Sequence, residues 1–405
     1  MLRPGPDFWD RPRPARESRP WRGARPSAIL ARMSLGLLPP LAPFAPLAVA
    51  MLLALEPCGP PDPGIPTGAA TLRRSVVQQL PELGPIENVV RLAPAPEDGG
   101  EVWVGGQNGC ARLTTDGAER GRVRFAHRVV NPVPIDVDGD GRWETMACGG
   151  GWSDVGLLDA EGHPLWHFPD GAHSLAAADA MAAGPVGPNG SLAFVIGMNG
   201  GDGVHFLDVE GARFRHVDGS NVFSVAVADL DGDGAAEIVH SGGGGFGGRI
   251  WVRDRDGAPL RRLDAELGFF SLIRWPEPDS PPRLLGIDDD TVQVVDPCVE
   301  PDGEVLAEFE LPDGGFAEPA GTLVRLAAGA PRFLAVSRTI RATWHRSALY
   351  VYDSERRLVY HEVFPHPHLG IVAVPSAAGG AEDLLVGVGT TLWRYSWQPQ
   401  PPVSK

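Results

Sequence analysis

The sequence lacks the signatures of several large protein classes. Its four cysteines are widely spaced and form neither a CxxC pair nor a zinc-finger pattern. The net charge is −16, so the basic surface that a nucleic-acid-binding domain needs is absent. No GxSxG or HExxH motif is present, and no Lys-Ser/Thr pair follows the glycine run at 242–248. The sequence therefore identifies no catalytic nucleophile and predicts no nucleic-acid partner.

What the chain has in abundance is glycine and proline, with 52 and 41 residues respectively among 405. Short apolar runs alternate with turns rich in these two residues. Many short strands joined by such turns are typical of an all-β sandwich or of a closed ring of sheets. The composition therefore predicts an all-β protein.

Two nine-residue segments, DVDGDGRWE at 136–144 and DLDGDGAAE at 229–237, share one spacing of carboxylates. Carboxylates at every second position of a straight strand would repel each other, whereas a tight loop brings them to one point. A hard divalent cation is the usual reason for such a loop, and calcium suits its oxygen ligands best. The residues at the seventh position would contribute main-chain carbonyls. The candidate ligands of two Ca²⁺ sites are Asp136, Asp138, Asp140, Arg142, Glu144, Asp229, Asp231, Asp233, Ala235 and Glu237.

These loops have two alternative interpretations. Solvated acidic turns with no metal are one alternative. An EF-hand is the other, but its loop needs a glutamate at position twelve and helices on both sides. Position twelve is Ala147 in the first segment and His240 in the second, and the flanking residues read as strands.

The DxDGDGxxE motif between two short strands resembles the FG-GAP/VCBS repeats of integrin-α-like and bacterial surface propellers. The motif itself covers two repeats, and a weaker strand pattern extends over most of the chain from about residue 70. Glu144 and Glu237 stand where that family often has aspartate. The resemblance implies a β-propeller with bound calcium, and it identifies neither a ligand nor a reaction.

Alignment of the chain on the two acidic loops shows a period of about 46–50 residues, as in propeller blades. About seven units follow, and the last one lacks an outer strand. Residues Thr71–Val77 can supply that strand, which would close the ring and protect its edges. We expect a seven-bladed β-propeller of four-stranded blades over residues 70–398, with a short tail at 399–405.

The N-terminal part differs in composition from the repeats. Residues 1–32 contain eight arginines and no lysine, which predicts a basic disordered segment. Residues 33–57 include the uncharged apolar run from Ser34 to Leu55, which predicts a signal peptide or a membrane anchor and hence export. Cys58 follows the apolar run at the position where a lipoprotein carries its lipid-modified cysteine, although Pro57 before it fits such a site poorly. Residues 58–69 are predicted to form a Pro-rich linker. Met33 is an alternative start.

The predicted function is binding or scaffolding at the cell surface or in the periplasm. A protein or glycan would be the ligand, and the membrane would be reached only through the N-terminal segment. The alternative is a propeller enzyme, either a quinone-dependent dehydrogenase or a polysaccharide-active enzyme, whose site would be assembled from several blades. Cys110 and Cys148 lie in adjacent units and are either a disulfide or two thiols.

Histidines and tryptophans offer further candidate site residues. His361, His366 and His368 are candidate transition-metal ligands, but a solvated loop is the better interpretation of this segment. We expect the recurring tryptophans to pack between blades rather than to form a sugar-binding face.

Overall fold

The chain divides into two units, Met1–Ala54 and Leu55–Lys405, and all described residues belong to the second. The computed structural model describes residues 65–66, 70–92, 100–149, 154–169, 178–219, 221–242, 249–263, 265, 267–288, 291–300, 302–312, 319–340, 346–366, 370–377 and 379–399. The predicted basic segment, the signal or anchor segment and Cys58 lie outside these ranges. Within them, no helix has the length and apolar character that crossing a membrane requires.

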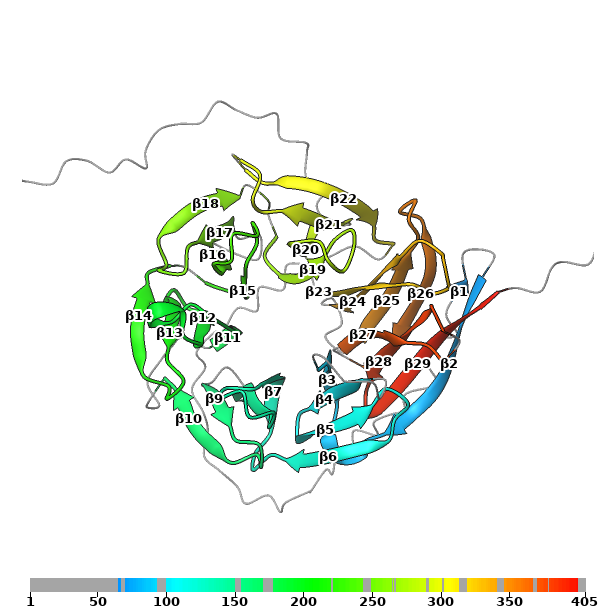
Figure 1. The fold of residues 1–405 in the computed structure, drawn as a ribbon, viewed down its shortest axis with the longest axis horizontal. Helices are drawn as coiled ribbons and strands as arrows, with labels where there is room; N and C mark the ends of the chain where they lie inside the picture. The colour runs from blue at the N-terminus through cyan, green and yellow to red at the C-terminus, as the bar shows by residue number, and fades with distance from the viewer. Residues whose placement is uncertain are drawn as a thin grey trace, which may run out of the picture. The chain divides into compact units, whose positions relative to one another are not determined.

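The second unit is a ring of seven antiparallel blades, as the sequence predicts (Figure 1). Blade 1 contains β3 (Ile86–Arg91), β4 (Glu101–Gly106), β5 (Gly109–Thr114) and β6 (Glu119–Arg124). Blade 2 contains β7 (Val129–Ile135), β8 (Glu144–Gly149), β9 (Val155–Leu158) and β10 (Pro164–Phe168). Blade 3 contains β11 (Ala178–Gly184), β12 (Ala193–Met198), β13 (Gly203–Leu207) and β14 (Arg213–Val217). Blade 4 contains β15 (Val225–Ala228), β16 (Glu237–Gly242), β17 (Arg249–Arg253) and β18 (Pro259–Leu263).

The remaining blades follow the same order from the centre outward. Blade 5 contains β19 (Phe270–Arg274), β20 (Pro282–Asp288), β21 (Thr291–Asp296) and β22 (Glu304–Glu310). Blade 6 contains β23 (Pro319–Val324), β24 (Phe333–Ile340), β25 (Arg346–Tyr352) and β26 (Leu358–Phe364), with β1 (Ile65–Pro66) added outside β26. Blade 7 contains β27 (Gly370–Pro375), β28 (Glu382–Val388), β29 (Thr391–Pro399) and β2 (Ala70–Gln79). The described helical segments are the 3-10 turns η1 (Pro81–Leu83) and η2 (Pro188–Gly190).

Blade 7 closes the ring with strands from both ends of the repeat region. β2 pairs antiparallel with β29 from Ala70 opposite Pro399 to Gln79 opposite Thr391. The pairing covers the edge of β29, which would otherwise be open to another chain. This confirms the prediction that Thr71–Val77 supplies the missing outer strand.

The buried apolar residues of the described ranges form seven clusters, each between two adjacent blades. Because both faces of a middle blade strand are covered, the second strands are largely buried, and all six residues of β12 and of β16 are buried. The outer strand β6 instead alternates between exposed and half-buried residues. Adjacent blades approach so closely that a Cβ atom on Gly387 would lie 2.4 Å from Ile86 Cγ2 across the closing junction.

Candidate functional site: two acidic loops and an adjacent pocket

The first acidic loop connects β7 to β8, the two inner strands of blade 2. Asp136 accepts hydrogen bonds from the amides of Gly139 (2.8 Å) and Gly141 (3.1 Å). Both glycines have positive φ, 77° and 80°, a conformation that side chains disfavour. The loop therefore curls around the Asp136 carboxylate instead of continuing the strand.

The other carboxylates of this loop are held by its own backbone. Asp138 accepts from the amide of Asp140 (3.1 Å), and Asp140 accepts from the amide of Arg142 (2.7 Å). Glu144, the first residue of β8, reaches back to the amide of Val137 (3.0 Å). Oxygens of Asp136, Asp138 and Asp140 all lie within 4.8 Å of one another.

The second acidic loop connects β15 to β16 in blade 4 and repeats this geometry. Asp229 accepts from the amides of Gly232 (2.7 Å) and Gly234 (3.0 Å), whose φ angles are 84° and 87°. Asp231 accepts from the amide of Asp233 at 3.1 Å. Asp233 in turn accepts from the amide of Ala235 at 2.7 Å.

Glu237 is the buried member of the second loop. It accepts from the amide of Leu230 at 2.8 Å, and its oxygens lie within 4.8 Å of those of Asp229 and Asp231. Burial raises the pKa of Glu237, the neighbouring loop carboxylates add to this, and the hydrogen bond from Leu230 opposes it. Glu144, its counterpart in the first loop, is less buried than Glu237.

The donor set of each loop fits a calcium ion. Calcium binds oxygen ligands at about 2.3–2.6 Å, so two ligands on opposite sides of one ion are separated by roughly 5 Å. In each cluster, one carboxylate oxygen from each of the three residues lies within 4.8 Å of the other two, so one ion could contact all three. Two of the predicted carboxylate ligands, Glu144 and Asp233, do not belong to these three-residue clusters. At the seventh position of each loop, the amide hydrogen bonds of Arg142 and Ala235 hold the backbone in place.

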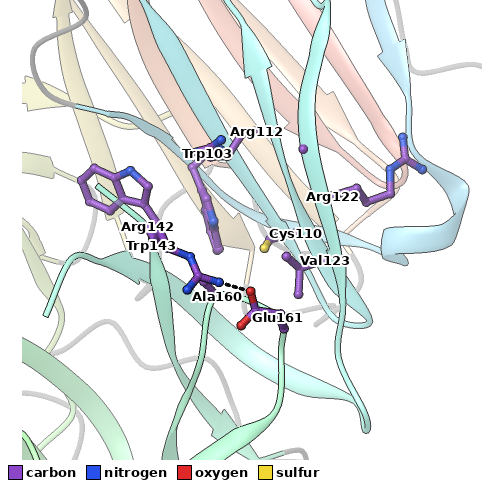
Figure 2. A pocket seen from close by; sticks show the side chains of 10 residues that line it. Trp103, Cys110, Arg112, Arg122, Val123, Arg142, Trp143, Ala160 and Glu161 are labelled. Carbon is purple, nitrogen blue, oxygen red and sulfur yellow. Dashed lines mark hydrogen bonds and ion pairs between the residues drawn. The ribbon is translucent and has the colours of Figure 1, made fainter. Parts of the chain in front are cut away.

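A pocket of about 240 Å³ lies between blades 1 and 2, next to the first acidic loop (Figure 2). Arg142, from the loop itself, forms an ion pair with Glu161 at its rim, and Trp143 stands beside them. Arg112 on β5 also lines the pocket, and within the described ranges no carboxylate forms an ion pair with it. The pocket thus offers an aromatic face and a half-buried guanidinium.

Cys110 lines the same pocket as a thiol. No disulfide joins it to Cys148, and the sulfur of Cys148 lies 3.9 Å from Met181 Sδ in the next blade. Burial raises the pKa of Cys110 to about 11, so the thiol stays protonated at neutral pH. Protonation leaves Cys110 a poor nucleophile.

The tryptophans of the blades pack largely as expected. Trp166 makes an edge contact with Phe194 of blade 3, and Trp275 packs against the apolar cluster between blades 5 and 6. The expectation that His361 lies in a solvated loop is wrong, because it belongs to β26 and its ring stacks on Tyr350 with centroids 4.8 Å apart. Strand pairing thus extends further along this segment than its Pro and His content indicates. His368 lies outside the described residues.

One cluster of titratable residues has no recognisable motif in the sequence. Asp202, His205 and His216 of blade 3 converge, with ligand atoms within 4.8 Å of one another. The two histidines stand in separate strand-like segments, GVHFL and RFRHV. Only the register of these strands reveals that they are neighbours.

Comparison with known proteins supports the fold and leaves the family open. No protein-family model and no curated protein matches the chain, so FG-GAP/VCBS membership stays a prediction. The structure of BBS1N in complex with ARL6DN is similar, with a TM-score of 0.53 and 14% identity over 84% of this chain and 99% of that chain. The streptogramin B lyase structure is also similar, with a TM-score of 0.52 and 14% identity over 81% of this chain and 98% of that chain. The chain is thus similar in fold to a protein that was solved in complex with a partner and to a lyase.

Proposed function

We propose that this protein is a calcium-stabilised binding or scaffolding β-propeller of the FG-GAP/VCBS type that acts outside the cytoplasm. The observation that carries the proposal is the pattern of amide-to-carboxylate hydrogen bonds that the two acidic loops share. Each loop turns three carboxylates toward one point and connects the first two strands of a blade. A cation at that point would offset their repulsion and fasten the innermost strand to its neighbour.

Calorimetric titration of calcium into the metal-depleted full chain tests the metal sites. We expect two ions to bind, Asp138→Ala to remove the first and Asp231→Ala to remove the second. The variant Asp254→Ala is the matched control, because Asp254 accepts amide hydrogen bonds in a β17–β18 turn in the same way but belongs to neither cluster. Fewer than two ions in the parent, or two ions in the double variant, contradict the proposal.

The pocket beside the first loop is the candidate site for the ligand. Trp143 presents an aromatic face on which a sugar ring can stack, and Arg112 presents a guanidinium suited to a carboxylate. These two groups favour an acidic glycan over a neutral one. The ligand would lie next to the first acidic loop, which contains Arg142, so the same loop would contact both the calcium ion and the ligand.

Binding of uronic-acid oligosaccharides, followed by calorimetry in calcium, tests this site. Trp143→Ala and Arg112→Gln should each weaken binding at least tenfold. Trp251→Ala is the matched control, since Trp251 is also half-buried and lies near two arginines, Arg253 and Arg262, but in blade 4. Equal losses in all three variants, or no binding by the parent, count against an acidic-glycan ligand.

Export and the enzyme alternative have separate tests. Fractionation of a bacterial host should place the full chain outside the cytoplasm and a chain starting at Gly59 inside it, and Cys58→Ser tests lipid attachment.

A quinone-type absorption spectrum after addition of quinone and calcium would favour the dehydrogenase, and degradation of a polysaccharide would favour the glycan-active enzyme.

A further inference from the structure

The outer half of blade 3 carries a pair of histidines on adjacent strands. His205 on β13 stands directly opposite His216 on β14 in the antiparallel register. Residues in such positions share a face of the sheet, with Cβ atoms about 5 Å apart. The imidazole rings accordingly stack, with their centroids 4.4 Å apart. Asp202 lies in the turn between β12 and β13, at the end of the sheet where both rings point.

The three side chains face each other with the atoms that bind metals. His205 Nε2 lies 3.2 Å from one carboxylate oxygen of Asp202, and His216 Nε2 lies 3.8 Å from the other. In this structure each Nε2 donates a hydrogen bond to the main-chain carbonyl oxygen of Asp202, at 3.1 Å from His205 and 2.6 Å from His216, and a bound metal ion would replace these two hydrogen bonds. Two ring nitrogens and a carboxylate therefore surround one small volume.

We propose that Asp202, His205 and His216 bind a divalent transition-metal ion, with zinc as the ion. Zinc binds imidazole nitrogen at about 2.0–2.1 Å and carboxylate oxygen at about 2.0–2.2 Å, so ligands at the corners of a tetrahedron are roughly 3.4 Å apart. The separations of 3.2 and 3.8 Å between the nitrogens and the carboxylate oxygens are close to that value. Calcium is the wrong ion here, because it prefers six or more oxygen ligands.

The surroundings determine which ring nitrogens are available. A metal-bound Nε2 carries no hydrogen, so each neutral ring must carry it on Nδ1. Nδ1 of His216 lies 3.5 Å from a carboxylate oxygen of Asp218, an arrangement that orients metal-bound histidines in many proteins. Nδ1 of His205 faces Nη1 of Arg213 at 3.4 Å, and this exposed side chain has to rotate away when the metal binds.

The rigidity of the site differs among its three ligands. His205 is almost completely buried, with its side chain 1% exposed, and its ring also packs 5.1 Å from that of Phe168 in blade 2. The side chains of Asp202 and His216 are 49% and 31% exposed, which leaves the ion a path from solvent. Three protein ligands leave a fourth position for water.

The experiment uses the full chain in saturating calcium, which keeps the acidic loops occupied by their own ion. Cobalt(II) is titrated in, its visible absorption is followed, and zinc is then added as a competitor. We expect one cobalt ion in a tetrahedral spectrum that zinc abolishes. His216→Asn and Asp202→Asn should each weaken binding at least tenfold.

The matched control is His163→Asn. His163 also pairs with an aspartate, since its Nδ1 lies 3.2 Å from Asp159, but the metal-ligand clusters of the described residues do not include it. It should leave the cobalt spectrum unchanged. Melting curves in EDTA establish that each variant folds. Because Asp202 is exposed, Asp202→Asn is expected to disturb folding less than a change at a histidine. Absence of the spectrum in the parent, or undiminished binding in both folded variants, overturns the proposal.

Discussion

The phenol of Tyr395 on β29 donates a hydrogen bond of 2.8 Å to the carboxylate of Glu362 on β26, and this contact joins blade 7 to blade 6. The same carboxylate accepts from the phenol of Tyr360 at 2.6 Å and pairs with Arg74 on the closing strand β2. Glu362 is 2% exposed. Three blade strands that are distant in sequence thus share one buried negative charge.

Replacement of that charge should destabilise the ring closure. Removing one partner of a buried ion pair leaves the other uncompensated, which costs about 3–5 kcal/mol in fully buried cases. The Arg74 side chain is 28% exposed, so for Glu362→Gln we expect about 2 kcal/mol in the free energy of unfolding. Urea unfolding measures it. Glu355→Gln is the control, since its ion pair with Arg357 is mostly exposed, and equal effects of the two changes would contradict a special role for Glu362.

Acid should destabilise the protein through His240. Burial is the main reason that the pKa of His240 falls to about 4, and the guanidinium of Arg253, whose Nε donates to His240 Nε2 at 2.8 Å, adds to it. In the unfolded chain the pKa is about 6.5. The neutral ring therefore contributes stability that is fully present above pH 6.5 and is lost as the pH falls toward 4, on the order of 3 kcal/mol.

Denaturant unfolding at several pH values checks this contribution. His240→Gln should flatten the dependence between pH 6.5 and 4, and His163→Asn, at an exposed histidine, should leave it as in the parent. An equally steep loss of stability in His240→Gln would show that other groups cause it.

Calcium removal should lower the melting temperature. An ion that binds only the folded state stabilises it by about 2.7 kcal/mol per site at a hundredfold excess over Kd. Magnesium should restore little of this, because it demands a tighter octahedral cage. Differential scanning calorimetry with and without chelator measures the shift. Full restoration by magnesium would show that the loops are not calcium-selective.

Loss of the closing strand should cause aggregation. A chain that begins after Gln79 lacks β2 and exposes the edge of β29 over the whole length of their pairing. A chain that begins at Gly64 keeps both β1 and β2 and is the matched control. Light scattering after purification compares the two. If the shorter chain stays monomeric with an unchanged melting temperature, β2 is dispensable for closure.

The sequence by itself determined the features that depend on neighbouring residues. The turns of the acidic loops follow from alternating aspartates and positive-φ glycines such as Gly141 and Gly234, because an aspartate hydrogen-bonds to amides only two to five residues away. The number of blades follows from the repeat period, since each blade is an antiparallel meander that is local in the chain. Even the closing strand was predictable, because one blade lacked a fourth strand.

Only the tertiary structure decided which side chains meet between strands and blades. His205 and His216 are eleven positions apart, and a shift of one residue in register would turn one ring to the other face of the sheet. Arg74 and Glu362 are separated by 288 positions, and the pocket near Trp143 combines residues of two blades. Such contacts are set by register and by the packing of one sheet on the next, and neither leaves a local pattern in the sequence.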